Sequence, residues 1–376
     1  MIRHTLIAVI LLACVNTVPA LAQSQGPAEA GRYIEQPVPT ATGQTTPPAK
    51  PATAPPPPAI RRWLDVQQLS MGGRFRWYEN SAGRLISSTL QWQPQIRARF
   101  LFDQAAKYSV NGFASSGATF PSSWNNTGGG IGLYTHPFNL KQLFAQAEPV
   151  KGLEFQAGGL HLNRGENSEN LSYATAAYIV GERVAVRPAK GRIAQVSFTA
   201  AYFGDYRQPN LFKRFHRLNE WNYGQALVGV RVSPRVNASA EYTYEDRRDI
   251  LRQAVTIRPP ESLKKITSVK VETYQRIAPD RGYGFNTSAD LRLTPRLVVT
   301  GGVMSVDKNY GPFNGDRYET GNRWYTIGTF TVTRDVTVSW FQTEAFATDF
   351  PITLTHRFDL LIAYNPTASL KRAGSV

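Results

Sequence analysis

Apolar and polar residues alternate along most of the chain from about Val66 onward. Within Gln91–Phe102 the even positions carry mostly apolar side chains such as Trp92 and Ile96, and the odd positions carry mostly glutamine and arginine. Residues 285–294 alternate in the same way. Because successive side chains of a β-strand point to opposite faces, this pattern predicts strands with one apolar and one polar face.

The predicted strands are long. They span roughly 8–14 residues, whereas a strand of a soluble sheet has about 5–6 residues and a tilted membrane strand about 9–11. Aromatic residues such as Trp77, Trp92 and Tyr244 lie toward the ends of the apolar rows, as in the interfacial girdles of membrane barrels. We therefore expect an all-β fold, a transmembrane antiparallel up-and-down β-barrel.

The connections between the predicted strands alternate in length. Seven short ones, most with Pro, Gly or Asp, are typical of hairpin turns and are separated by eight longer polar segments. They join sixteen strands, of which Leu251–Arg258 is the weakest; if it is a loop, fourteen strands remain. An even number of strands puts the start and the end of the barrel chain on the same side of the membrane. In outer-membrane barrels the short turns lie on the periplasmic side and the longer loops on the extracellular side. Sixteen strands leave room for an aqueous channel.

The first sixty residues differ from the rest. Residues 1–22 combine Arg3, an apolar run and Ala20-Leu21-Ala22, which predicts a cleaved signal peptide; lipoprotein processing at Cys14 is the alternative. Residues 23–60 are rich in proline and predict a disordered periplasmic linker. This linker is either a spacer or a segment that reaches peptidoglycan or a periplasmic partner. The barrel then spans residues 61–366, and residues 367–376 form a C-terminal tail.

Composition supports an exported, polar barrel and offers little catalytic chemistry. The formal net charge is +15 and the mean hydropathy is −0.31. Cys14 is the only cysteine, so we expect neither a disulfide nor a cysteine metal site. His136 and His161 are the best enzyme candidates, but no triad or metal spacing accompanies them. We expect no enzyme activity and no cofactor, and no nucleic-acid binding, because the basic residues are interleaved across strands.

The signal peptide, the tandem amphipathic hairpins and the strand-like Arg357–Tyr364 together resemble bacterial outer-membrane porins and porin-like barrels over nearly all of residues 61–366. The resemblance implies an outer-membrane location, insertion by the barrel-assembly machinery, contact with membrane lipid and passage of small solutes. The basic segment 210–221 is a candidate contact for lipopolysaccharide. Porins usually end on an aromatic residue, whereas Asn365–Val376 follow Tyr364 here, which leaves room for polysaccharide export or another specialised barrel.

If the apolar rows face lipid, the opposite rows line the lumen and carry many bases. The predicted pore-lining residues are Arg74, Arg76, Arg97, Arg99, Arg183, Arg187, Arg231, Arg235, Arg252, Lys270, Arg292 and Arg357. Such a lining favours an anion-preferring passive pore. The alternative is that lumenal acids such as Glu241 and Asp359 neutralise the arginines. Polymer export and a non-conducting structural or adhesive barrel also stay open.

A long early loop, residues 119–139, is the predicted constriction. Its candidate residues are Trp124, Asn125 and Asn126, which precede three glycines. The loop folds into the lumen or remains a mobile outer loop. Neither the solute nor the oligomeric state follows from the pattern.

Overall fold

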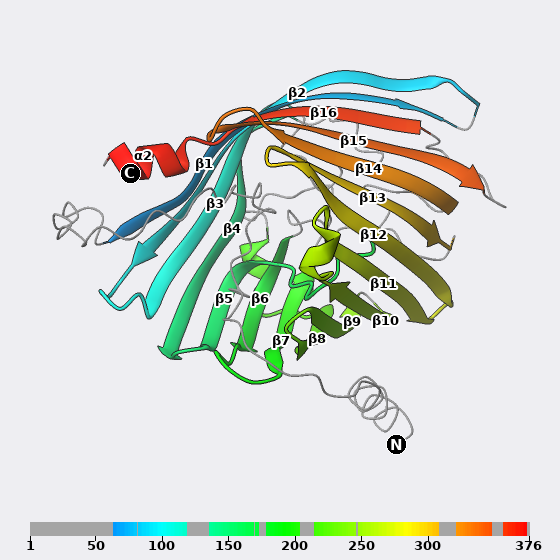
Figure 1. The fold of residues 1–376 in the computed structure, drawn as a ribbon. Helices are drawn as coiled ribbons and strands as arrows, with labels where there is room; N and C mark the ends of the chain where they lie inside the picture. Colours follow the sequence, from blue (N-terminus) through cyan, green and yellow to red (C-terminus); the bar gives the residue numbers. More distant parts are fainter. Residues whose placement is uncertain are drawn as a thin grey trace.

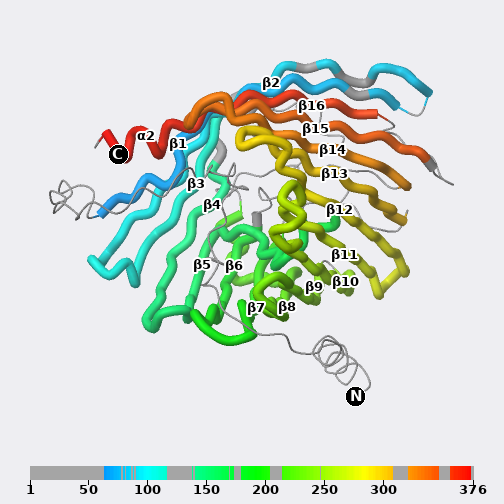
Figure 2. Tube along the Cα trace, in the orientation of Figure 1, coloured from blue at the N-terminus to red at the C-terminus, as the bar shows by residue number. Residues whose placement is uncertain are grey.

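The computed structural model is a closed barrel of sixteen antiparallel strands, in which each strand pairs with its sequence neighbours and β16 pairs with β1 (Figure 1). It describes residues 63–80, 82–118, 135–168, 170–172, 178–203, 214–245, 247–307, 321–347 and 356–373. The predicted signal peptide and proline-rich linker lie outside these residues. Coloured along the sequence, the chain runs once around the wall from blue to red (Figure 2).

The strands are β1 (Leu64–Glu79), β2 (Leu85–Leu101), β3 (Tyr108–Ala118), β4 (Thr135–Val150), β5 (Leu153–His161), β6 (Tyr178–Val186), β7 (Ile193–Phe203), β8 (Tyr223–Ser233), β9 (Val236–Glu245), β10 (Arg248–Ile257), β11 (Ile266–Ala278), β12 (Gly282–Thr294), β13 (Leu297–Val306), β14 (Gly321–Thr331), β15 (Val336–Ala347) and β16 (His356–Tyr364). Short 3-10 helices η4 (Phe215–Arg217) and η5 (Glu261–Leu263) lie between strands, and helix α2 (Thr367–Ala373) follows β16. Because β10 is a strand, the prediction of sixteen strands is confirmed and the fourteen-strand alternative is wrong.

The two faces of the wall carry opposite chemistry. Leu90 and Phe198 point outward and are 78% and 59% exposed. Arg76, Gln91 and Asn286 point inward and are fully buried. The period-two pattern of the sequence therefore sorts most apolar side chains to the outside of the barrel and most polar side chains to the inside, and two apolar clusters also lie inside.

Strand β4 begins at Thr135 and is longer than the alternation around Leu140–Ala147 predicts. Its pairing with β3 shifts register opposite Phe113 and Ala114. An irregularity of this kind breaks the strict alternation of faces. Leu140, Lys141 and Gln142 are consequently buried in succession, which explains why the pattern is blurred there.

Short turns lie at one end of the barrel, together with the start of β1 and the end of β16; we call this end the turn end. In the turn between β2 and β3, Asp103 accepts hydrogen bonds from the backbone N–H of Lys107 (3.1 Å) and Tyr108 (2.7 Å). Desolvation raises the pKa of Asp103, but these backbone hydrogen bonds outweigh it and hold the pKa below its ordinary value. The turn is therefore stabilised by an ionised carboxylate.

Helix α2 covers an overhang of β1 at the turn end. Pairing between β1 and β16 starts at Met71 and Tyr364, so residues 64–70 extend beyond β16. The Oγ1 of Thr367 accepts a hydrogen bond from the N–H of Leu69 (2.7 Å) and donates one to its carbonyl (3.2 Å). The helix thus satisfies part of a strand edge that would otherwise be open. Among the described residues, no helix is long and apolar enough to cross a membrane.

Candidate functional site

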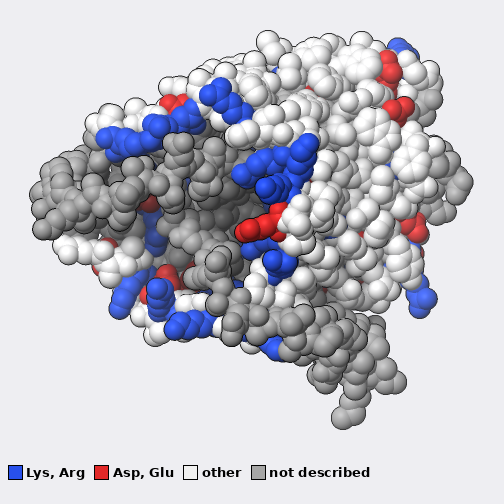
Figure 3. All heavy atoms as spheres, viewed as in Figure 1, with Lys and Arg blue, Asp and Glu red and all other residues white. Residues whose placement is uncertain are grey.

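Arginine side chains dominate the interior of the barrel. Its largest fully buried side chains are Arg76, Arg183, Arg252, Arg323 and Arg357, together with three tyrosines. Each arginine occupies a strand position whose neighbours in sequence face outward, so the alternation directs it inward. On the face shown in Figure 3, Lys and Arg side chains border a hollow, with a few Asp and Glu among them.

Three arginines converge on one carboxylate across the seam between β1 and β16. Arg76 donates two hydrogen bonds of 2.9 Å to the two Oδ atoms of Asp359. Arg357 pairs with the same carboxylate at 2.5 Å, and a nitrogen of Arg74 lies 4.0 Å from it. One negative charge therefore faces three positive charges, which leaves this part of the interior positive.

A second buried pair joins β9 and β10. Arg252 donates to Glu241 at 2.9 Å, and both side chains are fully buried. The same guanidinium donates its Nε–H to the backbone carbonyl of Leu171 at 3.1 Å. Leu171 belongs to the segment after β5, so the ion pair of the wall also holds a loop inside the barrel.

Residues 162–168 and 170–172 follow β5 and cross the interior; together we call them the inward loop. Its first part bonds to β7 and β8: Asn163 donates to Ser197 Oγ (3.0 Å) and accepts at its carbonyl from Gln225 (2.6 Å). The hydroxyl of Ser168 then donates to Glu272 Oε2 on β11 at 2.6 Å. The loop therefore spans the interior from β7 to β11 through polar bonds.

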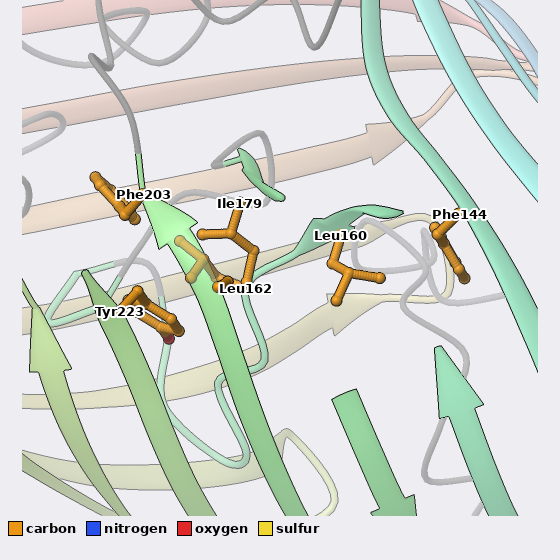
Figure 4. Packing of buried hydrophobic residues seen from close by; sticks show 7 residues of the cluster. Phe144, Leu160, Leu162, Ile179, Phe203 and Tyr223 are labelled. Carbon is orange, nitrogen blue, oxygen red and sulfur yellow. The ribbon is translucent and has the colours of Figure 1, made fainter. Parts of the chain in front are cut away.

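Two leucines anchor the inward loop in apolar clusters inside the barrel. Leu162 packs in a cluster with Leu160, Ile179, Phe203 and Tyr223, seen from close by in Figure 4. The second anchor, at the far end of the loop, packs in a cluster whose members are Leu171, Ile250, Tyr274, Met304, Val306, Tyr325 and Phe341. Burial of these side chains stabilises the loop inside the barrel by about 1.5–3 kcal/mol each.

Gly165 allows the inward loop to approach the wall closely. Its φ is +55°, a backbone conformation that favours glycine. A Cβ at this position would lie 2.8 Å from both side-chain atoms of Ser239 on β9. The neighbouring N–H of Glu166 donates to the Oγ of that serine at 2.8 Å. The hydrogen bond between Glu166 and Ser239 therefore requires a residue without a side chain at position 165.

The inward loop is a different segment from residues 119–139, which the sequence predicts as the constriction. The predicted candidates Trp124, Asn125 and Asn126 lie outside the described residues. The inward loop belongs to the connection between β5 and β6, and its local signal is weak: a polar run with one glycine, bounded by Leu162 and Leu171. Its inward direction depends on partners such as Ser239 and Glu272, which are far away in sequence.

At the turn end the barrel encloses a cavity of about 1190 Å³. Its wall includes Arg97, Arg99, Arg187 and Arg292. Arg187 pairs with Glu154 across the β5–β6 hairpin. Within the described residues, Arg99 and Arg292 have no carboxylate at ion-pair distance. The lining also includes Asp65, Asp290 and Asp335, so among the described residues its six basic side chains exceed its four acidic ones.

The other predicted pore-lining residues lie in different surroundings. Arg183 is buried and donates to Thr199 (3.0 Å) and Gln156 (3.2 Å). Arg231 donates to backbone carbonyls of the β6–β7 turn, including that of Ile193 (3.1 Å). Arg235 is exposed in the β8–β9 turn, and Lys270 is half-buried on β11. Arg231, Arg235 and Lys270 do not line the turn-end cavity.

Sequence analysis missed several buried bases, among them Arg276 on β11, Arg323 and Lys141. Arg323 is fully buried on β14 and Lys141 nearly so on β4. Both lie where the alternation is blurred, and the ammonium of Lys141 sits 5.1 Å from the ring centre of Phe113. Within the described part of the chain, no group of three or more His, Cys, Asp or Glu side chains is arranged to hold a metal ion.

Comparison with known proteins supports the fold. No family model and no curated protein sequence matches the chain. Solved structures of similar fold include a variant of the porin of Rh. blastica, with a TM-score of 0.51 and 10% identity over 80% of this chain and 99% of that one. Another is the outer membrane channel DcaP of Acinetobacter baumannii, with a TM-score of 0.50 and 9% identity over 81% of this chain and 97% of that one. At such identities the likeness concerns the fold, which is a porin-like sixteen-strand barrel.

Proposed function

We propose that the protein is an outer-membrane channel for the passive diffusion of small solutes, with a preference for anions. The observation that carries this proposal is the positive lining of the turn-end cavity, where Arg99 and Arg292 have no carboxylate partner among the described residues. Fixed positive charge along a water-filled path raises the local concentration of anions. Rings of arginine or lysine act as filters for anions and phosphates in other pores.

The proposal includes a location and an orientation. The apolar outer face suits lipid, and short turns are typical of the periplasmic side of such barrels. The turn-end cavity would then open toward the periplasm. Export through a cleaved signal peptide, insertion by the barrel-assembly machinery and contact with lipopolysaccharide at the opposite side belong to the same proposal.

Two other functions have weaker support. A polymer-export barrel needs a wide path, whereas the inward loop crosses the interior from β7 to β11. A non-conducting structural barrel needs a filled interior, whereas about 1190 Å³ remains open at the turn end. Solved structures of similar fold include a porin and an outer membrane channel. This likeness in fold supports the proposal of a conducting barrel.

The reversal potential of single channels tests the proposal. The refolded protein is inserted into a planar bilayer under a KCl gradient. We expect the sign of the potential that chloride preference produces. The double variant Arg99→Gln, Arg292→Gln should move the potential toward zero, because it removes two positive charges from the cavity wall.

The matched control is Arg235→Gln, which removes an exposed arginine outside the cavity. It should leave the reversal potential close to that of the unchanged protein. Preference for potassium would contradict the anion channel. Complete absence of conductance from correctly folded protein would favour a structural barrel.

A further inference from the structure

Amide side chains are concentrated on one wall of the turn-end cavity. Its amide-bearing residues on β1 to β5, which we call the amide wall, are Gln67, Gln68, Gln93, Gln95, Asn111, Gln142, Gln146 and Gln156. The opposite wall, on β12 to β16, presents hydroxyl and apolar side chains such as Thr300, Ser339 and Leu361. A water-filled path needs polar groups, but it does not need a single type of polar group gathered on neighbouring strands.

Two cross-strand contacts between amides are long, whereas Gln95 donates a short hydrogen bond to Gln93 and Gln68 donates one of 2.9 Å to Ser70. The Nε2 of Gln68 lies 3.3 Å from Gln95 Oε1, and the Nδ2 of Asn111 lies 3.5 Å from Gln146 Oε1. Such distances are at or beyond the upper end of the normal range for N–H···O bonds. The bonds around Asp359 are shorter, at 2.9 Å. A ligand can therefore replace the contact between Asn111 and Gln146 at lower cost than it can open the arginine network.

Positive charge is interleaved with the amides. Gln95, Arg97 and Arg99 occupy successive inward positions of β2. The Cα of Arg99 pairs with that of Asn111 on β3, and Asn111 in turn contacts Gln146 on β4. Adjacent strands are about 4.8 Å apart. The guanidinium of Arg99 and the amides of Asn111 and Gln146 thus lie within the span of one small ligand, whereas Gln95 lies four residues further along β2.

The chemistry of these groups defines the ligand. A guanidinium binds a carboxylate through two parallel hydrogen bonds. An amide offers a donor and an acceptor side by side, which matches a pair of neighbouring hydroxyl groups. A simple inorganic anion would use the arginines and leave the amides unused. A neutral sugar would use the amides and leave the arginines unused.

We propose that the amide wall with Arg97 and Arg99 is a binding subsite for polyhydroxylated carboxylates of the sugar-acid class. The inference rests on the proposed channel function, because the ligand is a permeating solute. The carboxylate lies against the arginines of β2, and the hydroxyl groups exchange hydrogen bonds with Asn111 and Gln146. The subsite slows this class of solute in the channel and so selects it from other anions of equal charge.

Block of the single-channel current tests the subsite. The three probes are glucuronate, cyclohexanecarboxylate and glucose, which separate the hydroxyl groups from the charge. Glucuronate should block at a concentration about tenfold lower than cyclohexanecarboxylate, since one or two added hydrogen bonds of about 1 kcal/mol correspond to that ratio. Glucose should block more weakly than glucuronate, because it has no group for the arginines.

Variants then locate the effect. The pair Asn111→Thr, Gln146→Thr keeps polar side chains that suit a strand but removes the two amides nearest Arg99, and it should abolish the tenfold difference. Gln253→Thr is the matched control, because Gln253 lies on the row of outward positions of β10. Should the paired variant fail to fold, Gln146→Glu keeps the shape of the side chain and should weaken block by glucuronate through repulsion of its carboxylate.

Each outcome separates the subsite from the channel. Equal block by glucuronate and cyclohexanecarboxylate, with chloride preference intact, would overturn the subsite and leave the anion channel standing. Equal block by glucose and glucuronate would overturn the role of the arginines. If the unchanged protein shows no preference for anions, the proposed channel function is contradicted. The subsite proposal then fails with it.

Discussion

At the scale of single residues, the interior arginines differ in what neutralises them. Arg76 and Arg357 share Asp359, and Arg252 pairs with Glu241. The sequence pattern predicts the face on which a residue lies, because parity along a strand is a local property. It does not predict the partner: Arg76 and Asp359 are 283 positions apart and meet only because the barrel closes.

Glu182 stands out on the outer surface. It is the central residue of β6 and is exposed on the outward face. The residues beside it on the neighbouring strands are Ala157 and Ala200. An ionisable side chain facing lipid near the middle of a strand is destabilising, although less so for Glu than for Arg or Lys, which cost about 2–4 kcal/mol at the midplane.

We predict that Glu182→Val stabilises the barrel in a bilayer. Removal of the carboxylate from the lipid-facing row should raise the free energy of unfolding by on the order of 1–2 kcal/mol. Denaturant unfolding of the protein in vesicles measures this change.

Ala200→Val is the control for Glu182→Val, since it adds apolar volume to the same face without removing a charge; it should change stability by a smaller amount. A loss of stability in Glu182→Val would contradict the prediction. It would indicate that the carboxylate contacts a group outside this chain, such as a second barrel.

At the scale of elements, the alternation predicts most of the strands well. Strands such as β2 and β12 have a regular period of two because each of their faces is in constant surroundings, the outer surface on one side and the barrel interior on the other. The pattern fails where the register shifts, as in β4. It also fails for the inward loop, whose path is set by side chains of β7 to β11 rather than by its own sequence.

The inward loop should control the conductance. We predict that Gly165→Val displaces it, because the new side chain would clash with Ser239 and the φ of +55° disfavours a branched residue. The strain should lower the free energy of unfolding by about 1–3 kcal/mol. Single-channel conductance should rise, since the loop leaves the path between β8 and β11.

Gly191→Val is the matched control for this prediction. Gly191 also has a positive φ, of +95°, but a Cβ there meets no atom within 4 Å. Backbone strain should therefore lower stability while the conductance stays the same. If Gly165→Val loses stability with no change in conductance, the inward loop does not limit permeation.

At the scale of the whole molecule, the barrel reverses the arrangement of a soluble protein. The apolar side chains form the outer surface, and the polar network and the inward loop fill part of the interior. The wall itself does not depend on this filling, because every strand pairs on both sides around the closed sheet. Interior substitutions can therefore change selectivity without opening the barrel.

The positive charge of the cavity acts on solutes through a field, and a field is screened by salt. The Debye length falls from about 10 Å at about 0.1 M salt to about 3 Å at about 1 M. In a cavity of about 1190 Å³ an ion on the axis lies beyond 3 Å from most of the wall. We therefore predict that the anion preference, measured from reversal potentials at the two mean salt concentrations, decreases strongly at the higher one. An anion preference that stays constant across this range would mean that ions are selected by direct contact with individual side chains at the inward loop, where water and screening ions are excluded, and not by the summed field of the cavity arginines.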